Sequence, residues 1–110
     1  MYTSKEFKKR VNKIIKANLL NPNLKDEFIA NEMGVSRMYI HRKLKTYYKM
    51  NARELITKKK ITFAKDQLLQ TDLPITFIAK MVHFHDMSHF SKTFKKWTGY
   101  TPTGYRKLID

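Results

Sequence analysis

The chain carries apolar side chains at the three- and four-residue spacing of amphipathic helices, interrupted at a few short breaks. The first segment, residues 1–20, begins at Thr3 and Glu6, whose spacing is that of a capping box. Its apolar positions, from Phe7 onward, fall on one face. We therefore predict an N-terminal helix that ends near Asn18.

Residues 24–50 have the pattern of a helix, a tight turn and a second helix. The first of these helices starts near Lys25 and has an apolar side. Gly34 permits the turn, and Ser36 is a suitable N-cap for the next helix. That helix has an apolar side too, and its opposite face carries Met38, His41, Arg42 and Lys45. The segment therefore predicts a helix-turn-helix with a candidate recognition helix.

Residues 51–70 predict one long connecting helix, because Asn51 and Glu54 have capping-box spacing and no break follows before about Gln70. Its apolar residues fall on two sides, Ile56 and Phe63 on one, and Ile61, Ala64 and Leu68 on the other. A helix with two apolar sides can contact both halves of the protein. The lysine run at 58–60 is expected on its solvated surface.

Residues 74–108 repeat the pattern of helix, turn and helix and add a short closing helix. The first helix follows Pro74, the turn falls at residues 83–85, and Thr101 begins the closing helix. The apolar positions expected to pack are Ile78, Ala79, Val82, Phe90, Phe94, Trp97, Tyr105 and Leu108. On the second helix, the face opposite Phe90 carries short hydroxyls and lysines without an acid, a composition that suits the DNA major groove.

The two helix-turn-helix segments are repeats of one another. The tripeptide at 28–30 recurs at 77–79, 49 residues later, and the pattern of residues 40–47 recurs at 90–97, 50 residues later. The second turn is therefore one residue longer than the first. We predict an all-α fold for a single domain of residues 1–110, with about seven helices and two helix-turn-helix subdomains joined by the long central helix.

The charge of the chain favours a polyanionic partner. Lys and Arg number 23 against 9 Asp and Glu, which gives a formal net charge of +14. The chain has no cysteine, no signal-peptide core and no apolar run long enough to span a bilayer, so a cytoplasmic location without membrane contact is expected. With three glycines, no phosphate-cradling loop and no nucleophile and base at motif spacing, an enzyme is not predicted.

A metal site is not predicted either, although His83, His85 and His89 lie close together in the sequence. Cysteine is absent, and Asp86 is better explained as the N-cap of the second recognition helix. No cofactor is expected.

The stretch from Pro74 to Tyr105 closely resembles the second helix-turn-helix of AraC/XylS-type transcription regulators. The matching positions are Ile78, Ala79, Phe84, Asp86, Ser88, Phe90, Ser91, Lys92, Phe94, Lys95, Gly99, Thr101, Pro102, Tyr105 and Arg106. His83 departs from the pattern, because the family usually has glycine at this turn, and a positive φ is expected there. The resemblance covers roughly residues 24–108.

The resemblance implies sequence-specific binding of double-stranded DNA, with each recognition helix in one of two successive major grooves. Its candidate base-reading residues are Met38, His41, Arg42, Met87, Ser88, His89 and Lys92. The candidate phosphate contacts are Ser36, Arg37, Lys43, Lys45, Thr46, Ser91, Lys95 and Lys96. Arg42 is the strongest candidate, since a guanidinium can bind guanine through two hydrogen bonds.

The resemblance also implies a C-terminal output domain of a larger regulator, with the sensor or receiver domain missing from this chain and RNA polymerase as a further partner. A small stand-alone member is the alternative. The basic composition alone leaves two other classes open, a non-specific architectural or RNA-binding protein and a basic membrane-surface protein. The membrane class fits less well, because the cations are spread over several helices.

Overall fold

The computed structural model describes residues 2–109, and within that range all regular structure is helical. The predicted all-α fold class is confirmed, with seven α-helices and a terminal 3-10 turn in the described residues. The chain divides into two compact units, one reaching to Lys59 and the other beginning at Lys60. The boundary falls inside the long helix α4, Ala52–Gln70.

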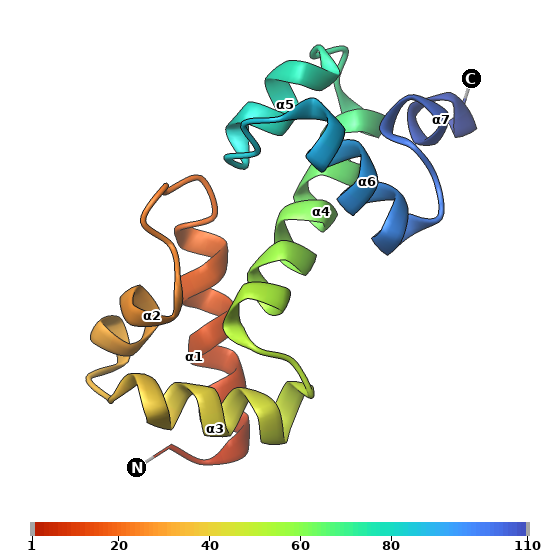
Figure 1. Cartoon of the computed structure of the whole chain (residues 1–110). Coiled ribbons are helices and arrows are strands. Elements are labelled where there is room, and N and C mark those ends of the chain that lie inside the picture. The colour runs from red at the N-terminus through yellow and green to blue at the C-terminus, as the bar shows by residue number, and fades with distance from the viewer. Residues whose placement is uncertain (1, 110) are drawn as a thin grey trace. The chain divides into compact units, whose positions relative to one another are not determined.

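The first unit contains α1 (Ser4–Ala17), α2 (Asp26–Met33), α3 (Arg37–Tyr48) and the start of α4 (Figure 1). The helix starts follow local sequence signals: the predicted capping boxes are present at Thr3 with Glu6 and at Asn51 with Glu54. The buried apolar side chains of this unit are Phe7, Val11, Ile14, Ile15, Leu19, Leu24, Ile29, Ala30, Met33, Ile40, Leu44, Ala52, Leu55 and Ile56. Phe7 joins α1 to α3 through edge-on contacts with Tyr39 and Tyr47.

The second unit contains the rest of α4, then α5 (Ile75–Met81), α6 (Met87–Thr98), α7 (Pro102–Arg106) and the 3-10 turn Lys107–Ile109. Its core cluster consists of Ile61, Ala64, Leu68, Ile78, Ala79, Val82, Phe84, Phe90 and Phe94. Arg106 donates to the carbonyls of Leu68 and Thr71, at 3.0 and 3.3 Å, and so fastens α7 to the end of α4. Both recognition helices thus lie on apolar cores within their own units.

The turns of the two helix-turn-helix motifs begin with the same backbone geometry, although the second is one residue longer. Gly34 ends α2 with a φ of 66°, and His83 has a φ of 64°, so the positive φ expected at His83 is confirmed. In the first turn, the Val35 amide donates to the carbonyl of Ala30. The Phe84 amide makes the corresponding bond to Ala79, five residues back in each case.

Three expectations need correction. Leu108 was expected to pack, but its side chain is 53% exposed, because the last α-helix ends at Arg106 and a 3-10 turn follows. Lys60 is half-buried and lies 6.0 Å from the ring centroid of Phe84, and this burial lowers its pKa. Phe63 was expected on the side of α4 opposite to that of Ile61. It packs instead against the same core cluster that contains Ile61.

Candidate nucleic-acid interface

The helix α3 is held so that one face is buried and the other is open to solvent. Its N-cap is Ser36, whose Oγ accepts from the Tyr39 amide at 3.0 Å. Ile40 and Leu44 are fully buried in the first unit. The exposed residues include four predicted to face DNA, Met38, His41, Arg42 and Lys45. The predicted reading face is therefore solvent-accessible.

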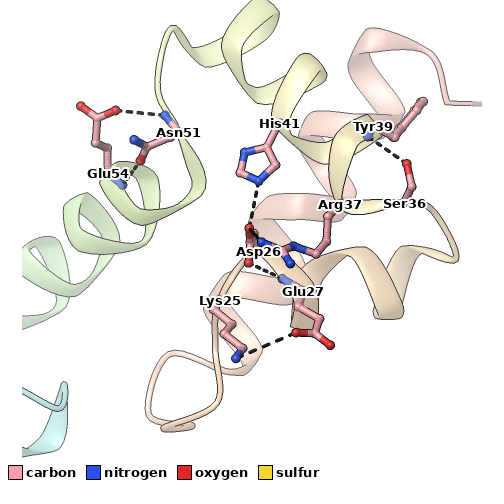
Figure 2. A network of polar contacts seen from close by, with 9 residues as sticks. All are labelled: Lys25, Asp26, Glu27, Ser36, Arg37, Tyr39, His41, Asn51 and Glu54. Atoms are coloured by element: carbon pink, nitrogen blue, oxygen red, sulfur yellow. Dashed lines mark hydrogen bonds and ion pairs between the residues drawn. The ribbon is translucent and has the colours of Figure 1, made fainter.

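Two residues of α3 are held by an acid from the preceding helix (Figure 2). Asp26 is the first residue of α2, and its Oδ2 lies 2.9 Å from His41 Nε2 and 3.3 Å from Arg37 Nη2. The other oxygen, Oδ1, accepts from the Glu27 amide at 2.7 Å. Asp26 therefore connects the start of α2 to both residues.

The contacts of Asp26 favour its ionised form. Partial burial raises the pKa of the carboxyl, but this effect is outweighed by the hydrogen bond from the Glu27 amide and the positive charge of Arg37, with a smaller contribution from His41. The pKa of Asp26 consequently lies below the ordinary aspartate value. A carboxylate thus sits beside the predicted reading face of a strongly basic protein.

The other candidates on α3 differ in how they are held. Among the described residues, Met38 is the most exposed large apolar side chain, at 70%. The Thr46 hydroxyl donates to the carbonyl of Arg42 within the helix, and the Lys43 ammonium lies over the rings of Tyr39 and Tyr47, at 5.6 and 5.7 Å. Local contacts within the first unit therefore hold the side chains of Thr46 and Lys43.

The second recognition helix, α6, starts at the predicted cap. Asp86 Oδ1 accepts from the Ser88 amide at 2.7 Å, and Phe90 and Phe94 are fully buried in the core cluster. The exposed candidates on this helix are Ser88, His89, Lys92, Lys95 and Lys96. They form a hydrophilic face with three cations and no acid.

Two candidates on α6 are less accessible than the sequence suggested. Met87 is half-buried and packs against the core cluster, and Ser91 is also half-buried. His89 is exposed, but its ring lies 5.2 Å from that of Phe84, which restricts its orientation. On this helix, Ser88 and Lys92 are the base-reading candidates for which the structure shows no such restriction.

The candidate site residues predicted from the sequence did not include Asp26. The repeat contains a signal that could have identified it. The position 49 residues later is Ile75, which packs against the core of the second unit. An acid at the equivalent of an apolar packing position indicates a specific polar partner on the neighbouring helix.

The described residues contain neither a cluster of metal ligands nor a membrane-spanning helix. Among residues 2–109, no three His, Cys, Asp or Glu side chains are grouped so that they could hold a metal ion. In the same range, no helix is long and apolar enough to cross a bilayer.

Comparison with known proteins identifies the family to which this chain belongs. A family model described as a helix-turn-helix domain matches residues 29–108. The raffinose operon transcriptional regulatory protein RafR of Pediococcus pentosaceus is 33% identical over 81 residues, which cover 74% of this chain and 29% of that protein. The probable transcription factor PqrA of Proteus vulgaris is 30% identical over 79% of this chain and 71% of its own.

Solved structures agree. The C-terminal domain of AraT, a response regulator from Geobacillus stearothermophilus, is 32% identical and superposes with a TM-score of 0.81, covering 90% of this chain and 82% of that domain. A transcriptional regulator with an AraC-type DNA-binding domain from Chromobacterium violaceum is 28% identical, with a TM-score of 0.85 over 89% of this chain and 87% of that one. The two units, their matched turns and these relatives lead to one assignment. The chain belongs to the AraC/XylS-type transcription regulators and contains their helix-turn-helix DNA-binding domain.

Proposed function

We propose that the protein binds double-stranded DNA sequence-specifically and that α3 and α6 each read part of one asymmetric site. The observation that carries the proposal is shared by both helices. Each buries its apolar side in its own unit and exposes cations and hydrogen-bonding side chains, with no acid within the helix itself. The major groove presents a pattern of donors and acceptors that such a face can distinguish. Family membership supports the placement of the helices in successive major grooves.

Within this proposal, Arg42 and Lys92 are counterparts. They stand 50 residues apart, in the register of the repeat, and both are exposed. Arg42 has a planar guanidinium that can bind guanine through two hydrogen bonds, whereas Lys92 provides a single charged group. We therefore assign base reading to Arg42, and to Lys92 either base reading or a phosphate contact.

The test measures affinities for a set of duplexes in which each base pair of the selected site is changed in turn. Arg42→Ala is expected to lose discrimination at a few adjacent positions, at a cost of about 1–3 kcal/mol, while the rest of the site keeps its preference. Lys92→Ala does the same at other positions if Lys92 reads a base, and weakens all duplexes equally if it contacts phosphate. Arg53→Ala, which removes an exposed arginine from α4, is the matched control. An even loss for every duplex in Arg42→Ala would contradict the assignment.

Salt dependence tests the charge contribution separately. If about six phosphates are neutralised, the logarithm of affinity should fall against the logarithm of salt concentration with a slope near −5. Competition by random duplex and by structured RNA then separates sequence-specific binding from architectural and RNA-binding alternatives. Equal competition by random duplex would contradict sequence specificity.

The role in a larger regulator is also part of the proposal. The chain spans 29% of the length of RafR and 29% of that of the transcriptional activator NphR from a Rhodococcus species. Similar segments occur in a response regulator and in histidine kinase P4 of Formosa agariphila. These relatives support a role as an output domain controlled by a sensor or receiver domain, with RNA polymerase as the partner that responds to binding.

A further inference from the structure

We propose that Asp26 is a positioning residue for base reading: its carboxylate orients the imidazole of His41 on the reading face of α3. This inference rests on the proposed function of α3 as a reading helix. In it, Asp26 acts on base preference through His41 and does not itself bind a base.

The geometry gives Asp26 a fixed position and leaves its partners accessible. Oδ1 is held by the Glu27 amide at 2.7 Å, while Oδ2 meets His41 and Arg37 at 2.9 and 3.3 Å. The side chain of Asp26 is only 19% exposed, against 47% for His41 and 62% for Arg37. Figure 2 shows both basic side chains directed from α3 toward this carboxylate. The acid is therefore the shielded part of the cluster, and the imidazole is the part that DNA can reach.

The contact also determines what the imidazole can offer to a base. The carboxylate can only accept, so the ring must present a proton on Nε2. That leaves Nδ1 for another partner, as an acceptor in the neutral ring or as a donor in the cationic ring. An acceptor suits the amino groups of adenine and cytosine, whereas a donor suits N7 and O6 of guanine. Without Asp26, either nitrogen could carry the proton of the neutral ring, and His41 would discriminate less well.

The second unit indicates that the charged cluster does more than join two helices. The equivalents of Asp26, Arg37 and His41 in the repeat are Ile75, Met87 and Ser91. Ile75 and Met87 both pack against the core cluster of that unit. An apolar pair therefore serves at these positions in the same fold. The first unit instead has three polar side chains, and two of them are on its recognition helix.

The test is a double-mutant cycle on base-resolved affinities, using Asp26→Asn, His41→Ala and the two together. Asp26→Asn is expected to reduce discrimination about two- to fivefold at the base pairs that His41→Ala affects, the range typical of exposed and partly exposed charge pairs. In the His41→Ala background, Asp26→Asn should change discrimination no further. The ¹⁵N signals of the His41 imidazole should shift in Asp26→Asn, showing a changed proton distribution.

Glu27→Gln is the matched control, because it removes the same charge at the next residue. The side chain of Glu27 is 55% exposed. Both substitutions reduce repulsion of phosphate and should raise affinity for all duplexes similarly, so only base discrimination separates them. Asp26→Ser, which keeps an oxygen for the Glu27 amide, replaces Asp26→Asn if the latter does not fold. Thermal melting of each variant identifies any loss of the fold.

Unchanged discrimination in Asp26→Asn, or an equal loss in the His41→Ala background, would overturn the proposal. These outcomes differ from failure of the proposed function. If Arg42→Ala loses discrimination and Asp26→Asn does not, α3 reads bases without help from Asp26. If Arg42→Ala and His41→Ala both weaken all duplexes evenly, α3 is not a reading helix and both proposals fall.

Discussion

The turns of the two helix-turn-helix units begin with the same backbone conformation but with different residues. Gly34 and His83 occupy equivalent positions, and their φ angles, 66° and 64°, are nearly equal. The amide after each donates to the carbonyl five residues back, Val35 to Ala30 and Phe84 to Ala79, at 3.0 and 2.9 Å. At His83, the hydrogen bond from Phe84 and the burial of Val82 and Phe84 therefore impose the left-handed conformation even though the residue is not glycine.

At the C-terminal ends of the recognition helices, the first unit has the larger residue and the second unit has glycine. Lys49 caps α3 with a φ of 58°, and Gly99 caps α6 with a φ of 84°. Each unit thus has one glycine and one larger residue at its two left-handed positions, in opposite order. Since a side chain at such a position costs about 1–2 kcal/mol, neither unit has both sites at their conformational optimum.

The largest expected difference concerns the cores beneath the two recognition helices. Leu44 and Phe94 are counterparts in the repeat, and both are fully buried. Leu44→Ala should cost about 2–5 kcal/mol and Phe94→Ala about 3–5 kcal/mol, because each leaves a cavity and the aromatic ring is larger. Denaturant unfolding measures the total loss in the free energy of unfolding for each variant, and hydrogen exchange shows which amides lose protection.

Leu20→Ala, at a residue that is 47% exposed, controls for truncation outside the core. It should cost far less than either buried substitution. Similar losses in all three variants would show that the two buried residues are not the supports of their helices.

The sequence was sufficient for features that depend on neighbouring residues. The capping boxes at Thr3 and Asn51 and the cap at Asp86 each follow from residues within a few positions. Local hydrogen bonds and backbone sterics determine such features, so they can be read in order along the chain. The positive φ at His83 was expected instead from the resemblance to a family that usually has glycine at this turn.

Features that depend on packing were harder to predict. Met87 is drawn against the core, Lys60 lies over a ring 24 residues away, and Asp26 meets His41 across the first turn. Helical periodicity gives the side of a helix but not what a neighbouring helix places against it. The identity of the recognition helices could therefore be predicted, whereas the accessibility and contacts of their individual side chains needed the structure.

An intermediate effect on stability is expected at the N-caps of the two recognition helices. Ser36 accepts from the Tyr39 amide at 3.0 Å, and Asp86 accepts from the Ser88 amide at 2.7 Å. Alanine at either position should cost about 1 kcal/mol, with Asp86→Ala at the upper end because its charge also interacts with the helix dipole. Thermal melting checks both variants. Asp86→Asn keeps an acceptor and should recover most of the loss, and a melting temperature as low as that of Asp86→Ala would mean that charge matters more than capping.

The smallest expected effects concern the positions with positive φ, where one unit has glycine and the other has a larger residue. Apart from the two adjacent residues, a Cβ at Gly34 or Gly99 would have no heavy atom within 4 Å, so alanine there meets no steric obstacle from the rest of the described structure. Gly34→Ala and Gly99→Ala should therefore be destabilised by about 1 kcal/mol through backbone conformation alone. His83→Gly and Lys49→Gly should be stabilised by somewhat less, because glycine also gains freedom in the unfolded chain.

The sign of the effect, rather than its size, is the decisive measurement. Lys45→Gly replaces the same residue type at an exposed position inside α3, where glycine should cost about 1 kcal/mol. Lys49→Gly and Lys45→Gly should thus move the free energy of unfolding in opposite directions, because one backbone is left-handed and the other helical. If both lower it, the left-handed conformation at Lys49 is not a source of strain. If His83→Gly alone is destabilised, native contacts of the His83 side chain outweigh its backbone strain, and the second turn depends on histidine for more than its geometry.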